Sequence, residues 1–173
     1  MIKNYILFIS FLFFQSVSSQ EQLNVFDVAR RGTVEQAKAL YSQDSKIFNT
    51  VNEAGFSPLL LACYRGNMEV AKFLISNGSN INANSSMGTP LMAATVKGNV
   101  EIVKALLDKK ADVNLSDANG ITALIYAVQF ANPEIISLLL QHKADKTHKD
   151  KEGKTAFEHA VFSGNETIIN LLK

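Results

Sequence analysis

Apolar residues occur along the chain in adjacent pairs, and most pairs are followed by another pair four residues later. Ile102 and Val103, for example, are followed by Leu106 and Leu107. Side chains at positions i and i+4 share one face of an α-helix, so the pattern predicts short amphipathic helices with one buried stripe each. Equivalent pairs begin at Val70, Ile135 and Ile168.

A second short helix is predicted before each of these helices. It begins with Ser or Thr followed by Pro or Ala, because the hydroxyl group suits an N-cap and Pro is tolerated at the first helical position. Gly66, Gly98 and Gly164 fit the left-handed position at which such a helix ends, and an Asn follows that can cap the next helix. The predicted starts are Ser57–Pro58, Thr89–Pro90, Thr122–Ala123 and Thr155–Ala156, and the Asn residues are Asn67, Asn99, Asn132 and Asn165.

These helix pairs recur with a nearly constant period. The residue after the N-cap falls at Pro58, Pro90, Ala123 and Ala156, which gives spacings of 32, 33 and 33 residues. A turn of the form Asp/Asn/Ser-x-x-Gly precedes each pair, at 52–55, 85–88, 117–120 and 150–153. Periods of this size indicate stacked repeats, in which each unit buries its apolar face against its neighbours.

With these landmarks, the chain resembles the ankyrin repeat family. The family pattern D-x-x-G-x-T-P-L-H-x-A is approached by GFSPLLLA, GTPLMAA, GITALIYA and GKTAFEHA, and the family's tail by NGSNIN (77–82), KKADVN (109–114) and HKADKT (142–147). The resemblance covers about residues 23–173. It implies an all-α solenoid of about five helix-turn-helix repeats joined by β-hairpin-like loops, at about 20–48, 49–81, 82–113, 114–146 and 147–173.

The chain departs from the family pattern in three ways. One residue is missing between Gly88 and Thr89, which predicts a tighter hairpin in the third repeat. Ala131 stands where the family has Gly between the two helices, and a left-handed conformation there would cost about 1 kcal/mol or more. Apolar packing is expected to replace the hydrogen bonds of the family's His, whose position is taken by Leu60, Met92, Ile125 and Glu158.

Both ends of the repeat array carry polar residues where the inner repeats are apolar. Asp27 and Gln36 do so in the first repeat, and Glu158 and His159 do so in the last. Terminal repeats need a polar outer face for solubility. The first and last repeats are therefore predicted to cap the stack.

Residues 1–19 are predicted to be a secretory signal peptide. Lys3 supplies a positive charge, residues 5–14 (YILFISFLFF) are apolar apart from Ser10, and small residues follow, which is the pattern of such a leader. A retained membrane anchor is the alternative, but a membrane span needs about 20 apolar residues. We expect cleavage between Ser19 and Gln20 and a periplasmic or secreted repeat domain, residues 20–173.

Composition narrows the class of partner. The chain has 17 basic and 16 acidic side chains and a formal net charge of +1, so no overall field favours nucleic acid. Its single Cys63 can form no internal disulfide and is interpreted as a small buried hydrophobic residue. We expect a monomer that does not insert into a membrane once the leader is removed.

No pattern in the sequence indicates catalysis or a cofactor. It has no Gly-rich phosphate loop and no H-E-x-x-H motif. His142, His148 and His159 are too few and too irregularly spaced for a metal site. The chain is therefore predicted not to be an enzyme and to bind no metal.

The resemblance implies that a protein partner docks on the hairpin tips and the exposed part of the first helices. At these positions the family pattern leaves the residue type free, and many of the residues present are apolar. If exposed, they form a broken apolar ribbon beside two cations. Such a ribbon would suit an interface, because aromatic residues, Met and Arg are enriched in interface cores. The alternative is that some of these side chains tuck under neighbouring repeats. The predicted partner-binding residues are Phe56, Tyr64, Arg65, Met87, Val96, Lys97, Ile121, Gln129, Phe130 and Phe162.

We therefore expect a non-catalytic, exported bacterial module for protein–protein interaction, with a partner that the sequence does not identify. Small exported ankyrin proteins to which the chain is similar are linked to catalase function and oxidative-stress protection, and this likeness rests on the fold alone. The alternative is an inhibitor or immunity protein that blocks an enzyme or a toxin.

Overall fold

The computed structural model describes residues 23–173, and within this range the chain forms five helix pairs. This confirms the predicted all-α solenoid of about five repeats. The first helices of the pairs are α1 (Val25–Arg31), α3 (Pro58–Arg65), α5 (Pro90–Val96), α7 (Ala123–Gln129) and α9 (Ala156–Ser163). The second helices are α2 (Val34–Gln43), α4 (Met68–Ser76), α6 (Val100–Asp108), α8 (Pro133–Gln141) and α10 (Glu166–Leu172), and a short 3₁₀ helix, η1, spans Ile47–Asn49.

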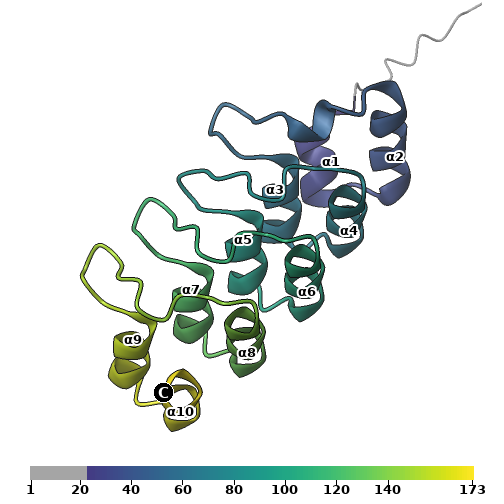
Figure 1. Cartoon of the computed structure of the whole chain (residues 1–173). Coiled ribbons are helices and arrows are strands. Elements are labelled where there is room, and N and C mark those ends of the chain that lie inside the picture. Colours follow the sequence, from purple (N-terminus) through teal and green to yellow (C-terminus); the bar gives the residue numbers. More distant parts are fainter. Residues whose placement is uncertain (1–22) are drawn as a thin grey trace, which may run out of the picture.

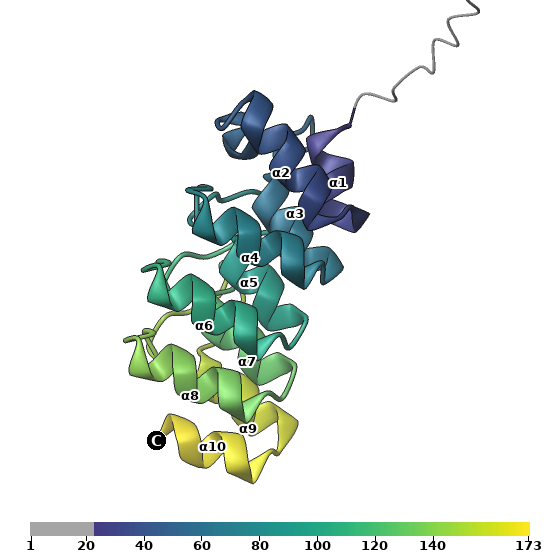
Figure 2. The same ribbon diagram turned by 90° about the vertical axis from the view of Figure 1, so that its right-hand side faces the viewer.

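The pairs stack side by side into one elongated, curved body (Figure 1). The first helices form one row, and the loops that join successive repeats project from that side of the stack (Figure 1). The second helices form a parallel row on the other side (Figure 2). Over residues 23–173, the helices are all too short and too polar to cross a membrane.

The predicted N-caps begin the first helices. Ser57 accepts a hydrogen bond from the Leu60 N–H at 3.1 Å, and Thr89, Thr122 and Thr155 make the equivalent bond in the later repeats. Such a bond satisfies a backbone donor that the helix leaves free at its start. The sequence therefore defines the start of each first helix locally.

The Asn residues that follow the first helices have two different roles. Asn99, Asn132 and Asn165 cap α6, α8 and α10 through their side chains, as predicted. Asn67 makes no such cap. Its Nδ2 instead donates to the carbonyl oxygens of Val28, Ala29 and Gly32, the last at 2.9 Å, and so ties the second repeat to the end of α1.

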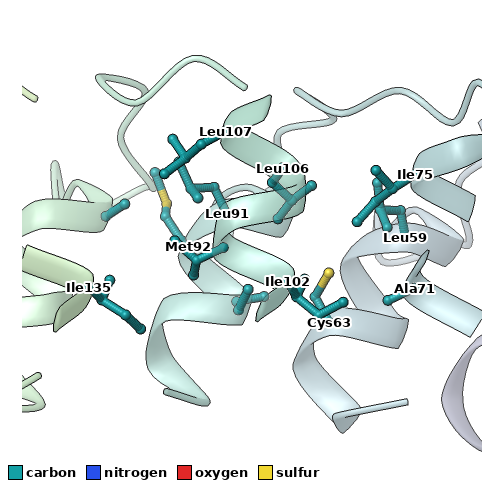
Figure 3. Close-up of a cluster of buried hydrophobic side chains, with 14 of the residues drawn as sticks. Leu59, Cys63, Ala71, Ile75, Leu91, Met92, Ile102, Leu106, Leu107 and Ile135 are labelled. Atoms are coloured by element: carbon teal, nitrogen blue, oxygen red, sulfur yellow. The ribbon is translucent and has the colours of Figure 1, made fainter. Parts of the chain in front are cut away.

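The apolar core runs without interruption through the stack. Figure 3 shows Leu59 and Cys63 of α3, Leu91 of α5, and Ile102 and Leu106 of α6, all at most 3% exposed. Full burial of one such Leu or Ile side chain stabilises the fold by about 1.5–3 kcal/mol. Because neighbouring repeats share these contacts, each repeat depends on the one beside it.

Asn side chains in the connecting loops join successive repeats. The Oδ1 atom of Asn49 accepts from the Asn80 N–H at 2.7 Å. The same bond recurs one repeat later from Asp112 to Asn82, at 2.9 Å. It recurs again from Asp145 to Asn114, at 2.8 Å.

Two of the four polar residues predicted to cap the ends of the stack complete helix caps. Gln36 and Glu158 each complete a capping box, with Thr33 and Thr155 as the N-cap. The outer face of the last repeat is only partly polar, however. Phe157 and Val161 are 37% and 52% exposed, whereas their counterparts in the fourth repeat, Leu124 and Val128, are 1% and 2% exposed.

Left-handed backbone recurs at the ends of helices. Ala131, at the turn between α7 and α8, has φ 51°, as expected for the position where Gly66 and Gly98 have φ 74° and 65°. Lys110 and Lys143 have φ 63° and 66° at the position where the second repeat has Gly78. These two Lys positions were not anticipated from the sequence.

Ala131→Gly should stabilise the protein by about 1 kcal/mol, since Gly adopts positive φ without the contact between Cβ and the carbonyl oxygen that Ala must tolerate. Urea unfolding followed by circular dichroism measures the effect. Ala39→Gly, at an exposed position inside α2, is the control and should destabilise the protein by about 0.5–1 kcal/mol. Destabilisation by both substitutions would show that Ala131 is not strained.

Candidate functional site

The hairpin loops differ in length between the repeats. In the second repeat, the Asn52 N–H donates to the Phe56 carbonyl at 3.1 Å, and bonds with the same spacing close the hairpins that begin at Asp117 and Asp150. In the third repeat, Ser85 and Gly88 bond to each other in both directions, so this hairpin is one residue shorter. The predicted tighter hairpin is therefore present.

Two of these hairpins are tied to the first helix of their own repeat by a buried carboxylate. Oδ1 of Asp117 accepts the backbone N–H groups of Asn119 and Ile121, and its Oδ2 accepts the Tyr126 hydroxyl at 2.6 Å. Burial, together with the hydrogen bond to Asp117 and its negative charge, raises the pKa of Tyr126. The phenol therefore stays protonated and holds the hairpin on α7.

The last repeat builds the same link with a different residue. Nε2 of His159 lies 2.7 Å from Oδ2 of Asp150, and Oδ1 of Asp150 accepts the N–H groups of Glu152 and Lys154. Burial alone would raise the pKa of Asp150, but the Lys154 N–H, the His159 side chain and the Glu152 N–H outweigh it, so the pKa is lowered. Asp150 therefore favours the folded state in its charged form.

A hollow of about 300 Å³ lies between the second, third and fourth repeats, on the side of the first helices. The Tyr64 ring from α3 and the Tyr126 and Phe130 rings from α7 contribute to its walls. The Tyr126 and Phe130 rings are 6.4 Å apart. Other lining residues are Met87 of the short hairpin and Met92 and Ala93 of α5.

Four of the ten predicted partner-binding residues line this hollow: Tyr64, Met87, Val96 and Phe130. Met87 and Phe130 are 41% and 54% exposed, while Tyr64 and Val96 are half-buried. The apolar ribbon expected from the sequence is thus only partly exposed. Two of its exposed side chains, Met87 and Phe130, lie together at the hollow.

The other six predicted residues lie outside the hollow. Phe56 and Ile121 are half-buried and pack against the core. Phe162 is 91% exposed in the last repeat, where Lys154 Nζ lies 5.8 Å from its ring centroid. Arg65, Lys97 and Gln129 are exposed at the ends of the first helices.

Lys97 lies next to a residue that lines the hollow. Its Nζ lies 5.0 Å from the centroid of the Tyr64 ring, within the range of a cation–π contact. Tyr64 also lines the hollow. The ammonium group therefore stands close to the wall of the hollow.

Sequence reasoning missed Met92, Ala93 and Tyr126 as lining residues. The sequence does contain a signal for an open space. Leu61, Ala93 and Tyr126 occupy the same position in successive repeats, and Ala93 is much the smallest of the three side chains. The small Ala93 and the residue missing after Gly88 together leave space that belongs to the hollow.

The described residues offer little for covalent or metal chemistry. Within residues 23–173, no cluster of three His, Cys, Asp or Glu side chains is placed to hold a metal ion. Burial raises the pKa of the Cys63 thiol to about 12, so the thiol stays protonated in the core. The surface is suited to binding through shape, aromatic contacts and charge.

Comparison with known protein families identifies the family of this chain. The family model described as ankyrin repeats (3 copies) matches residues 25–117 and 110–173. This chain belongs to the ankyrin repeat family. Ankyrin repeat domains are typically non-catalytic and bind other proteins, so protein–protein interaction is the general role of this chain.

Segments similar to this chain occur in longer proteins. The chain is 46% identical over 48 residues to an acyl-CoA-binding domain-containing protein 6 homolog of Dictyostelium discoideum, which is 28% of this chain and 17% of that protein. It is 38% identical over 61 residues to BTB/POZ domain-containing protein 3 of Schizosaccharomyces pombe, which is 35% of this chain and 12% of that protein. The similarity spans less than a fifth of either relative.

The last ankyrin repeat should be sensitive to acid. Since the pKa of Asp150 is lowered in the folded state, its contribution to stability is complete above the unfolded pKa of about 3.9 and is lost as the pH falls through the folded pKa. Asp150→Asn keeps the size of the side chain but removes this titration. The variant should be less stable than the wild type at neutral pH, and the difference should shrink at low pH.

Urea unfolding at several pH values between about 7 and 2 measures this difference. Glu53→Gln is the control, because Glu53 is exposed and makes no side-chain hydrogen bond within residues 23–173. It should follow the wild-type pH dependence. An Asp150→Asn variant that differs from the wild type by the same amount at every pH would contradict the assignment.

Proposed function

We propose that this ankyrin protein is a non-catalytic, exported interaction module that docks a folded protein partner on its hairpin tips and first helices. The observation that carries the proposal is the hollow between the second and fourth repeats, with the exposed Met87 and Phe130 at its edge. Exposed apolar groups that gather at one place favour binding, whereas scattered ones are ordinary.

The composition of this surface supports an interface. Tyr64, Met87 and Phe130 are of the residue types enriched in the cores of protein interfaces, and the exposed Arg65 follows Tyr64 in α3. Aromatic anchors in pockets contribute most of the binding free energy in many complexes.

The backbone under this surface is preformed. Tyr64 and Phe130 stand at the ends of first helices, and the Asp117–Tyr126 bond holds the neighbouring hairpin on α7. A surface built on helices that are buried on their other side changes little on binding. Docking therefore proceeds with small changes of backbone in this protein.

Replacement of both Tyr64 and Phe130 by Ala should abolish capture of the partner from extract, while helical content and melting temperature stay close to those of the wild type. Capture is measured by affinity purification with mass spectrometry, and folding by circular dichroism. Val51→Ala, which truncates a 58% exposed apolar side chain outside the hollow, is the matched control. Equal capture by the wild type and the double variant would place the interface elsewhere.

Export through a cleaved leader is part of this proposal. The predicted signal peptide, residues 1–19, lies outside the described residues, and support for it comes from the charge and hydropathy pattern of the sequence alone. N-terminal sequencing of the protein expressed in a bacterial host should start at Gln20. A chain that retains Met1 and sediments with membranes would instead support the anchor.

The two candidate processes differ in what binding does to the partner. A partner such as a catalase, suggested by likeness of fold, should keep or gain activity when saturated with this protein. An enzyme or toxin blocked by an immunity protein should lose its activity at a stoichiometric ratio. A titration of the captured partner's activity separates the two.

A further inference from the structure

We propose that the hollow accepts one large apolar side chain from an extended segment of the partner, and that carboxylates in the same segment lie along Arg65 and Lys97. This inference rests on the proposed docking function and specifies the chemistry of the partner. The evidence is the origin of the hollow and the distribution of charge around it.

The hollow is a local property of the third repeat. The second and fourth repeats place Phe56 and Ile121 after the Gly of the hairpin, but the third has no residue there. The floor is the small Ala93, whose counterpart in the second repeat is Leu61. With a volume of about 300 Å³, the hollow has room for one large side chain.

In the first three repeats a cation lies at the C-terminal end of the first helix, and these three cations are called the inner row. Arg31, Arg65 and Lys97 occupy the same position in the first three repeats, directly before Gly32, Gly66 and Gly98. A cation at a helix C-terminus interacts favourably with the helix dipole. This interaction needs no carboxylate partner. Within residues 23–173, none of the three side chains takes part in an ion pair.

Two cations of the second helices, Lys72 and Lys104, are different. Lys72 lies 3.2 Å and 2.8 Å from carboxylate oxygens of Glu69 and Glu101. Lys104 lies 3.3 Å from Glu134. These two cations, the outer row, are thus paired within the protein, whereas Arg31, Arg65 and Lys97 are not.

Asp117 is the one carboxylate that lines the hollow. It is 8% exposed, and its two oxygens already accept three hydrogen bonds, from Asn119, Ile121 and Tyr126. The cation placed next to the wall of the hollow is Lys97, whose Nζ lies 5.0 Å from the centroid of the Tyr64 ring. An apolar anchor residue with acidic neighbours complements this surface in both shape and charge.

Selection of a display library of random linear peptides on the purified protein tests the proposal. Enriched peptides should share one Phe, Trp, Leu or Met with two or more Asp or Glu nearby. Affinities of the best peptide are then measured by fluorescence anisotropy for the wild type and the variants at low and high salt.

A larger side chain at position 93 should fill the hollow and keep the partner's apolar side chain out. Ala93→Leu, which places in the third repeat the side chain that the second repeat has at Leu61, should weaken binding by about tenfold or more. Met87→Ala changes an exposed loop residue and leaves the core untouched, so it keeps the test valid if Ala93→Leu folds poorly. It should weaken binding by about threefold to tenfold.

Arg65→Gln combined with Lys97→Gln should weaken binding by about threefold to tenfold at low salt and remove most of the salt dependence. Lys104→Gln removes the same charge from the outer row and should leave binding unchanged. A basic or uncharged consensus, no enrichment of any peptide, or self-association through the hollow in sedimentation experiments would overturn the proposal.

The outcomes also separate this inference from the proposed function. If partner capture depends on Tyr64 and Phe130 while the selected peptides lack acidic residues, docking stands and the assigned partner chemistry is wrong. If neither capture nor peptide binding occurs, both fail.

Discussion

Burial of apolar surface between adjacent repeats is the constraint on which the rest of this structure depends. Each helix pair has a face that it cannot cover alone, so its neighbour must supply the contact. The fourth and fifth repeats show this directly, because Leu124 and Val128 are buried while the equivalent Phe157 and Val161 stay partly exposed at the end of the stack. The Asn67 contacts to the end of α1 and the Asn bonds between loops then fix how the buried faces meet.

This constraint divides the residues of each repeat into two groups. Residues on the buried faces and at the caps are determined by packing and backbone hydrogen bonds, and they recur from repeat to repeat. Residues at the hairpin tips and the inner ends of the first helices are free to vary, as the change from Arg65 and Lys97 to Phe130 shows. Because the stack holds the repeats in register, a deletion of one residue in a single hairpin is not closed by movement of its neighbours. It leaves an open space beside Met87 and Ala93.

The fold could be predicted from the sequence because its signals are local and repeated. Thr or Ser N-caps, paired apolar residues and the left-handed Ala131 each depend on a few neighbouring residues, and each is found where expected. Lys110 and Lys143 were not anticipated at left-handed positions, although the aligned repeat tails place them where the second repeat has Gly78, because Lys is not a residue type that favours positive φ. The candidate site was harder to predict. The partial burial of Phe56 and Ile121 and the exposure of Phe130 depend on contacts between repeats, which side-chain type alone does not determine.

Charge follows the same division between fold and surface. Two cations on the second helices lie next to carboxylates of the adjacent repeat, so the pairs Lys72–Glu101 and Lys104–Glu134 join neighbours along the outer row. Exposed ion pairs of this kind contribute at most about 1 kcal/mol each, so the stack does not depend on them. The fold would equally tolerate carboxylates beside Arg65 and Lys97, since those positions are exposed and variable. Lys97, which has no carboxylate neighbour of this kind, therefore adds positive potential near the hollow, where the proposed acidic segment would be attracted before any contact forms.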